Sequence, residues 1–472
     1  MEIRGDHLLA INNKRYLVQG SERALLMLDS LKRTFLATCL TGLLLQPSLS
    51  VAQSTMTLFE DVRIFDGTSL TAKMNVAVEG NKITQISSQP ISSPTDAVHI
   101  AGNGQTLMPG LIDAHWHTFM VRPTMAQASM APLSFITLLA GAEAESTLMR
   151  GFTSVRDLGG PAFGLKLAID NGVIKGPRIW PSGAMISQTG GHGDFRMLSE
   201  IPSTPDQLSY PERVGISAIA DSPDEVRKRT REQLLQGASQ IKLTGGGGVS
   251  SPYGPIDTVQ LSVDEIHAAV EAAANWGTYV TVHAYTPEAI RNAIQAGAKV
   301  IEHGQLADDA TAKLMADTGT WWSLQPFLAD ENANQLPDAA GQARAAQVFA
   351  GTDNAYRLAK KYGVKVAFGT DVLFDANLAA RQGSQLSTMT RWYTPAEVLK
   401  MATADNAQLL ALSDRRNPYP GKLGVVEVGA LADLLLVNGD PLADIGLLAD
   451  PGKNLTVIMK DGQIVKNQLV AK

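Results

Sequence analysis

The sequence predicts an α/β protein: a (β/α)8 TIM barrel with a small β-sandwich domain built from both chain ends. The central part of the 472-residue chain alternates short apolar runs with helical stretches, which is typical of parallel strands joined by helices. Both ends instead carry alternating strands separated by hairpin turns. The length also fits one large barrel plus a second domain.

Eight apolar runs in the central part fit the buried strands of a barrel. Helical stretches lie between several of them, such as residues 262–277 and 286–297. The second stretch has Thr286 as a helix N-cap and Pro287 at the first helical position, and it ends at Gly297. The barrel strands are expected at residues 106–115, 152–157, 178–183, 239–244, 278–283, 299–303, 320–325 and 365–371.

The two ends of the chain are expected to form one β domain. Residues 56–67 and 74–88 alternate apolar and polar residues around Asp-Gly and Gly-Asn turns, and residues 432–440 and 455–468 have the same style. The sequence therefore predicts three parts. They are an N-terminal extension with a signal peptide at 1–52, a β-sandwich domain from 53–108 plus 418–472, and a barrel at 109–417.

Residues 27–52 have the layout of a secretory signal peptide. A basic start is followed by the apolar stretch 34–45 and by small residues that end at Ala52, the expected cleavage point. The apolar stretch is too short for a membrane span, so no stable span is expected in the mature protein. We expect translation from Met27 and a secreted or periplasmic location. The alternatives are an N-terminal amphipathic helix or a lipobox that ends at Cys39.

Composition limits the classes of partner. Cys39 is the single cysteine, so the chain has no intramolecular disulfide. The net charge is −6 and no run of Lys or Arg is present, which argues against nucleic acid as a partner. A small molecule or dipeptide is the expected substrate.

Polar residues with metal-binding potential gather at the carboxyl ends of the predicted strands. His115 and His117 are two residues apart on a strand, so both side chains point to the same face and can chelate one metal. Because barrel active sites lie at this end of the strands, the placement points to a metal site suited to zinc. Taken singly, the histidines could be core residues and Asp371 could cap a helix. The set is His115, His117, Lys242, His283, His303 and Asp371.

Lys242 lies within an apolar strand, where an ammonium group is costly. Burial lowers the pKa of a lysine and leaves some neutral amine, which can add carbon dioxide and become a carbamate. A carbamate can bridge two metal ions. A structural or snorkelling lysine is the other interpretation of Lys242.

These residues resemble the metal-site segments of the amidohydrolase superfamily in its two-metal form. The similarity covers roughly residues 57–466 and includes the C-terminal segment GVVEVGALADLLLVNGDPL. Within the superfamily, the chain is most similar to prolidase-like carboxypeptidases and bacterial ochratoxin-degrading amidohydrolases, through ISQTGGHGD and HAYTPEAI. The metal-site segments, in order, are GLIDAHWH, IKLTGGGG, VTVHAY, VIEHG and FGTD.

The resemblance implies the roles of these residues. One divalent metal, expected to be zinc, would take His115, His117, Asp371 and the carbamate on Lys242. The other would take that carbamate with His283 and His303. A hydroxide bridging the metals would attack the substrate, with Asp371 as catalytic base that passes the proton to the leaving amine. Relatives are often homo-oligomers and some are octamers, so a homo-oligomer is expected.

The subfamily resemblance adds His192 and Tyr285 as catalytic and substrate-binding residues that hold the scissile carbonyl or the terminal carboxylate of the substrate. Both can donate hydrogen bonds to an anion. Gly245 to Gly248 would allow close backbone approach to a ligand, with Gly246 as a substrate-binding position. Phe119, with Met120 and Met125, is expected to face a bulky apolar group.

The predicted function is hydrolysis of an amide bond to a C-terminal amino acid. The substrates considered are a dipeptide, an N-acyl amino acid, and ochratoxin A, which would give ochratoxin alpha and phenylalanine. One alternative is a lactonase, cyclic-amide hydrolase or deaminase on the same site; Lys242 argues against a deaminase, which usually keeps one metal. Another is a non-catalytic scaffold on this fold, although no expected ligand is missing.

Overall fold

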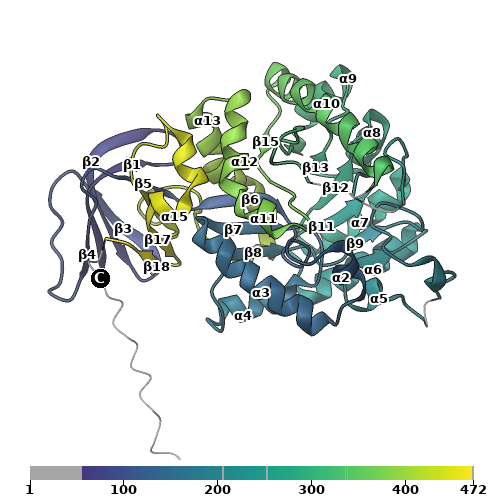
Figure 1. Ribbon diagram of the computed structural model, residues 1–472, viewed down its shortest axis with the longest axis horizontal. Coiled ribbons are helices and arrows are strands. Elements are labelled where there is room, and N and C mark those ends of the chain that lie inside the picture. The colour runs from purple at the N-terminus through teal and green to yellow at the C-terminus, as the bar shows by residue number, and fades with distance from the viewer. Residues whose placement is uncertain (1–55, 205–206, 251–252, 335, 337, 470–472) are drawn as a thin grey trace, which may run out of the picture. The chain divides into compact units, whose positions relative to one another are not determined.

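The computed structural model describes residues 56–204, 207–250, 253–334, 336 and 338–469 (Figure 1). The predicted signal segment, residues 27–52, lies outside the described residues. Residues 55–472 form one compact unit, so the predicted division of this part into a barrel and a second domain stays a prediction. None of the helices in the described ranges has the length and apolar character needed to cross a membrane.

Strands from both ends of the chain form one eight-stranded sheet, purple and yellow in Figure 1. The order is β18-β17-β16-β5-β1-β2-β3, and β4 pairs with β1. The two ends meet where β5 pairs antiparallel with β16, so that Met108 lies opposite Leu435. The strands are β1 (Thr57–Phe65), β2 (Leu70–Glu79), β3 (Lys82–Ser87), β4 (Val98–Ala101), β5 (Thr106–Pro109), β16 (Leu434–Val437), β17 (Leu455–Lys460) and β18 (Gln463–Asn467).

Strands in the eight predicted barrel runs form a ring of parallel strands together with β9, which was not predicted. One set, β6-β7-β8, and a second, β9-β11-β12-β13-β14-β15, are joined by backbone hydrogen bonds. The N–H of Ala114 donates to the Phe368 carbonyl at 2.9 Å, and the N–H of Ser239 donates to the Pro181 carbonyl at 2.8 Å. The strands are β6 (Leu111–Trp116), β7 (Phe152–Asp157), β8 (Arg178–Pro181), β9 (Met185–Ser187), β11 (Ile241–Thr244), β12 (Val280–Ala284), β13 (Val300–His303), β14 (Trp321–Ser323) and β15 (Val366–Ala367). A short strand, β10 (Ser217–Ile219), pairs with β9.

The prediction of one strand at residues 106–115 is wrong, because the run divides at Gly110. Residues before it form β5 in the sheet of the chain ends, and residues after it form β6 in the barrel. Gly110 permits this because a Cβ atom there would lie 2.0 Å from Oγ1 of Thr153.

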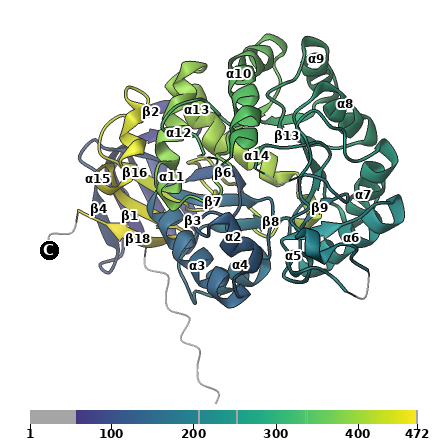
Figure 2. The ribbon, with the colours of Figure 1, turned by 45° about the vertical axis from the view of Figure 1, so that its right-hand side comes forward.

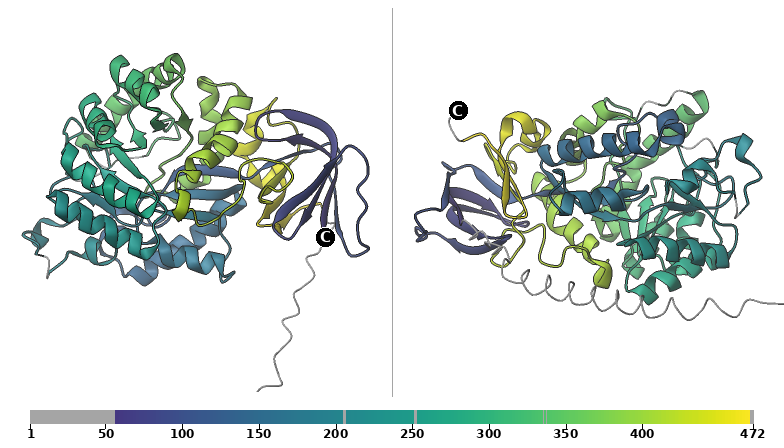
Figure 3. Two further views of the ribbon diagram at one scale, coloured as in Figure 1. Left: turned by 180° about the vertical axis from the view of Figure 1, so that it is seen from behind. Right: turned by 90° about the horizontal axis from the view of Figure 1, so that it is seen from below.

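Helices cover the outer side of the barrel strands, as Figures 2 and 3 show for α6 to α9. The predicted caps of α8 are confirmed. The Thr286 side chain accepts from the N–H of Ala289, and Gly297 ends the helix with φ of 101°. The helices are α2 (Met125–Met130), α3 (Leu133–Met149), α4 (Ala162–Asp170), α5 (Tyr210–Arg213), α6 (Pro223–Gln236), α7 (Val263–Trp276), α8 (Pro287–Ala296), α9 (Asp309–Thr318), α10 (Ala339–Tyr362), α11 (Ala376–Ala380), α12 (Gln382–Thr388), α13 (Pro395–Lys400), α14 (Asn406–Ala411) and α15 (Pro451–Asn454).

Candidate active site

The predicted metal ligands meet at the carboxyl end of the barrel, because parallel strands bring their ends to one rim. In register, Thr244 of β11 lies opposite His283 of β12, and Ala284 lies opposite His303 of β13. Asp371 follows β15, and its N–H donates to the carbonyl of His115 at 2.9 Å. The side chains that line one pocket include all six: His115, His117, Lys242, His283, His303 and Asp371.

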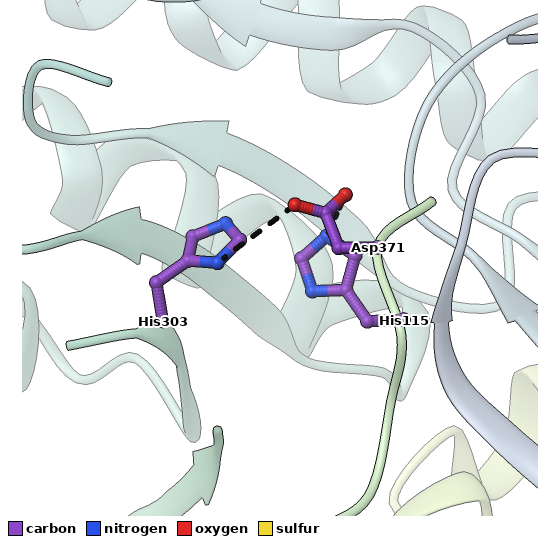
Figure 4. Close-up of side chains that lie close together, drawn as sticks. All are labelled: His115, His303 and Asp371. Carbon is purple, nitrogen blue, oxygen red and sulfur yellow. Dashed lines mark ion pairs between the residues drawn. The ribbon is translucent and has the colours of Figure 1, made fainter. Parts of the chain in front are cut away.

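Three ligand atoms converge at one side of this pocket. Nε2 of His115 lies 3.3 Å from Nε2 of His117. Oδ1 of Asp371 lies 3.3 Å from the first nitrogen and 3.2 Å from the second. Figure 4 shows His303 beside His115 and Asp371, with 4.0 Å between Nδ1 of His303 and Oδ2 of Asp371.

The spacing of these atoms fits a metal ion. Ligand atoms about 2.0–2.1 Å from zinc at tetrahedral angles lie about 3.3 Å apart. Oδ1 of Asp371 is buried and accepts no hydrogen bond within the described part of the chain. Burial, followed by the effects of Lys242 and His117, holds the pKa of His115 well below its usual value. A neutral His115 and an unpartnered carboxylate oxygen therefore face each other, and a cation between them removes the repulsion of their lone pairs.

The histidine rings are oriented by partners outside the ligand set. Nδ1 of His115 lies 2.7 Å from Oε2 of Glu302, and Nδ1 of His303 lies 2.8 Å from Oε1 of Gln325. Nε2 of His283 lies 2.9 Å from the carbonyl oxygen of Gly247. Each partner fixes one ring nitrogen as the donor, which leaves the other nitrogen as a lone-pair ligand. Burial keeps the pKa values of His283 and His303 well below normal, so both rings are neutral.

Lys242 differs from the rest of the set, because its buried amine lacks an ion-pair partner among the described residues. The residue is 2% exposed, and no carboxylate in the described ranges lies within ion-pair distance of its amine. Burial lowers the pKa of Lys242 to about 8, against the opposing influence of Glu302 and Asp371. A buried amine without an ion-pair partner is the feature that makes modification chemistry reasonable here.

Two of the ligands have strained backbones. The φ angles of His303 and Asp371 are 71° and 52°, in the left-handed region that residues other than glycine rarely occupy. Trp322 supports the strained turn, because its Nε1–H donates to the carbonyl of His303 at 2.6 Å. Such strain costs of the order of 1–3 kcal/mol per residue and is concentrated at functional sites.

A buried charge network beneath the histidines was missed by the sequence analysis. Glu302 accepts from Nη2 of Arg156 at 2.7 Å with one oxygen and contacts His115 with the other. Despite burial, Arg156 and Lys242 hold the pKa of Glu302 below its usual value, so it is a carboxylate. The available signal was a charged residue inside an apolar strand, in FTSVRD and in VIEH.

Asp113 is a second residue that the sequence analysis did not single out, and it precedes His115 by two positions on β6. It accepts from the N–H of His115 at 3.0 Å and from the Oγ1 hydroxyl of Thr370 at 2.7 Å. Asp113 therefore ties the end of β6 to the segment that carries Asp371. Burial raises the pKa of Asp113 to about 6.

His192 and Tyr285 line the same pocket. The rings of His192 and His283 stack with 4.1 Å between centroids. Burial, followed by Lys242, lowers the pKa of His192 to about 3, so the ring is neutral. Tyr285 is 3% exposed, and burial raises its pKa well above normal, which keeps the hydroxyl protonated as a donor.

Two predicted substrate-binding residues do not line this pocket. Phe119 packs in an apolar cluster with Trp116 and Val121. Gly246 pairs with Val259 in an isolated bridge. Gly248 lies close to a predicted site residue, since a Cβ atom there would lie 2.0 Å from Nδ1 of His192. Of the three side chains expected to face a substrate, Met120 lines the pocket.

The pocket contains about 520 Å³ of free space, part of it open to solvent, and it has both polar and apolar lining residues. We call it the catalytic pocket. Its apolar wall is formed by Met120, Met185, Phe195, Leu373 and Phe374, which also pack together as one cluster. The arrangement fits a substrate with one charged or polar end and one apolar group.

Comparisons with known proteins identify the family of the chain. The family model described as "Amidohydrolase family" matches residues 106–465. An ochratoxinase from Aspergillus niger is 32% identical over 379 residues, which covers 76% of this chain and 75% of the relative. A solved prolidase complexed with N-methylphosphonate-L-proline is 34% identical, with a TM-score of 0.80, and covers 88% of this chain and 100% of its own. A solved Xaa-Pro dipeptidase with bound methionine is 31% identical, with a TM-score of 0.75 and the same coverage.

These matches extend over most of the chain and over the whole barrel, and they confirm the TIM-barrel fold and a hydrolytic enzyme. The chain belongs to the amidohydrolase family.

Proposed function

We propose that this enzyme hydrolyses an amide bond between an acyl group and an amino acid with a free carboxylate. The substrate class includes dipeptides, N-acyl amino acids and ochratoxin A. The observation that carries the proposal is the convergence of His115, His117 and Asp371 at 3.2–3.3 Å beside the buried amine of Lys242. The similarity to an ochratoxinase, a prolidase and a Xaa-Pro dipeptidase supports the amino-acid side of the substrate.

Two divalent cations, proposed to be zinc, complete the site. His115, His117 and Asp371 would hold one, and His283 and His303 would hold the other. When bound, such ions polarise a carbonyl and increase the acidity of water. The residues present fit this role, because each of the four histidines has a ring nitrogen that lines or faces the pocket and lacks a fixed donor role.

Lys242 is proposed to carry a carbamate. Its neutral amine adds to the carbon of CO₂, a new N–C bond forms, and one amine proton is released to solvent. The product is a carboxylate on the lysine, which changes a buried cationic group into an anionic oxygen donor. A pKa of about 8 leaves enough neutral amine near neutral pH for this addition.

The remaining steps belong to side chains of this chain. Asp371, through the carboxylate oxygen that would not hold the cation, accepts a proton from the attacking water and gives it to the departing nitrogen. Water adds to the carbonyl carbon and the C–N bond breaks, which yields a carboxylic acid and an amine. Tyr285 and the neutral His192 donate hydrogen bonds to the developing oxyanion or to the substrate carboxylate.

The apolar wall of the catalytic pocket supports an apolar amino acid as the leaving group. Met and Phe side chains adapt to groups of different shape, so several amino acids would be accepted. Phenylalanine, methionine and proline at the C-terminal position are the first candidates.

The testing experiment is a mass-spectrometric hydrolysis screen with metal-loaded and metal-stripped enzyme. The panel contains Xaa-Pro and other dipeptides, N-acyl amino acids, ochratoxin A, lactones and cyclic amides. Metal-dependent release of a free C-terminal amino acid is the expected result. Turnover of lactones or cyclic amides alone would overturn the proposed substrate class.

A further inference from the structure

A second cavity adjoins the catalytic pocket and shares Asp371 and Tyr285 with it. We call it the side pocket; it contains about 480 Å³ of free space, part of it open to solvent. Segments after β14 and β15 and the helices α10 and α12 contribute its walls. Its apolar surface comes from Phe327, Val348, Phe349 and Leu378.

Two buried amide groups line the side pocket without a hydrogen-bond partner in the described part of the chain. They are Nε2 of Gln385, whose residue is 4% exposed, and Oδ1 of Asn334. Buried polar groups in folded proteins are normally paired, so an unpaired donor and an unpaired acceptor in one cavity call for a ligand.

Neighbouring amides on the same segments are paired. Oδ1 of Asn332 accepts from Nε of Arg381 at 2.9 Å. Nε2 of Gln382 donates to Oδ2 of Asp113 at 2.8 Å, and its oxygen accepts from Nε of Arg150 at 3.0 Å. Unpaired amide atoms are therefore not general in these segments, and within the side pocket they are those of Gln385 and Asn334, because Asn332, which also lines it, is paired.

The position of the side pocket assigns it to the acyl part of the substrate. This step rests on the proposed function. His192, which is proposed to hold the carboxylate, lines the catalytic pocket and is absent from the side pocket. Asp371, which is proposed to protonate the departing nitrogen, lines both. A substrate whose amino acid lies toward His192 extends its acyl group across Asp371 into the side pocket.

We propose that the side pocket is a specificity subsite for an aromatic acyl group that has no negative charge and carries both a hydrogen-bond donor and an acceptor. Phe327 and Phe349 supply surface for the ring. Gln385 donates to the acceptor and Asn334 accepts from the donor. Asp371 is the charged residue among the described residues that line the cavity, so an anionic acyl group is disfavoured.

The test compares three substrates that differ at one position: the N-(4-carbamoylbenzoyl), N-(4-isopropylbenzoyl) and N-(4-carboxybenzoyl) derivatives of L-phenylalanine. The carbamoyl and isopropyl groups have the same number of heavy atoms and a similar size, but they differ in hydrogen bonding. We expect kcat/KM to be at least tenfold higher for the carbamoyl compound than for the isopropyl compound, and lowest for the carboxy compound. A carbamoyl-to-isopropyl ratio near one in the wild-type enzyme overturns the proposal.

Variants test which residues cause the preference for the carbamoyl compound over the isopropyl compound. Gln385→Met keeps the side-chain length and removes the amide, and it should reduce the carbamoyl-to-isopropyl ratio at least fivefold while turnover of the isopropyl compound is kept. Gln347→Met, on an exposed position of α10, is the matched control and should leave the ratio unchanged. If Gln385→Met does not fold, Asn334→Leu in the loop after β14 tests the same pair. An unchanged ratio in the folded variant contradicts the subsite.

A binding measurement separates this inference from the proposed function. Calorimetry compares 4-carbamoylbenzoate with 4-isopropylbenzoate on the full-length enzyme and on Gln385→Met. If none of the amides is hydrolysed, the proposed function fails. A carbamoyl preference that Gln385→Met abolishes would still support the subsite, and equal binding of the two acids would overturn it.

Discussion

The two halves of the candidate metal site differ in how complete they are. His115, His117 and Asp371 form a first half in which three ligand atoms already converge at 3.2–3.3 Å. The second half contains His283 and His303 with Lys242, whose amine contributes no anionic oxygen. Encoded side chains supply three ligand atoms to the first half, whereas under the proposed function the second half obtains its anionic oxygen from the carbamate on Lys242.

The two halves also differ in the groups that orient them. His115 is held by Glu302, a carboxylate that is paired with Arg156. His283 and His303 are held by a backbone carbonyl and a neutral amide. A charged partner increases the basicity of an imidazole ligand more than a neutral one, so the first half should bind its metal more tightly.

The largest effect is expected from substitution of Lys242, the residue on which the second half depends for an anionic oxygen. Lys242→Ala should reduce bound metal from two ions per chain to about one and remove nearly all turnover. Metal analysis and kcat/KM on the same preparation measure both. Added short-chain carboxylic acids should restore part of the activity, because they replace the missing carboxylate. A Lys242→Ala variant with full activity would contradict the proposal that Lys242 completes the second half.

Tyr285→Phe should lower kcat by about 10²–10³-fold, the usual loss when one oxyanion donor is removed. Metal content should stay that of the wild type, since the phenolic oxygen belongs to neither half. Steady-state kinetics with parallel metal analysis measures the effect. Loss of metal would show that Tyr285 acts as part of the metal site.

Glu302→Gln should weaken metal binding by about 10–100-fold, because a neutral amide oxygen replaces the carboxylate that accepts the hydrogen of His115. The first half should lose affinity before the second, which a competition titration with a chelator resolves. Because Arg156 loses its buried partner, thermal unfolding must be measured to confirm that the variant is folded. Equal loss of metal affinity in both halves would contradict a role of Glu302 in the first half alone.

The smallest expected effect is on reactivation of stripped enzyme. With a pKa of about 8, the neutral fraction of Lys242 increases about tenfold from pH 7 to pH 9, and only this form adds CO₂. At a fixed concentration of dissolved CO₂, the reactivation rate should therefore increase about tenfold as the pH rises. A rate that is flat or falls over this interval contradicts carbamate formation on an amine with this pKa.

The sequence carried most of the information on the strands and on their ends. Apolar runs predicted the barrel strands apart from the break at Gly110, and the ends of those strands contain six of the residues that line the catalytic pocket. The strand break at Gly110 was not predictable, because it depends on contact with Thr153 from another strand. Local patterns contain no such long-range contact.

Loop residues were harder to place than strand residues. Phe119 directly follows β6, yet the turn directs it into the core, while its neighbour Met120 reaches the pocket. Gly246 and Gly248 are equivalent in the sequence, and only the position of His192 distinguishes them. The orienting role of Glu302 was likewise hidden, although its charge in an apolar strand was visible.

The most direct test of the account is ¹³C NMR of enzyme reconstituted with metal and ¹³C-labelled bicarbonate. The account predicts one protein-bound carbamate signal per chain that appears together with amide-hydrolase activity and is absent in Lys242→Ala. Full metal-dependent activity without such a signal would contradict the claim that the second half of the site is completed by a modified lysine.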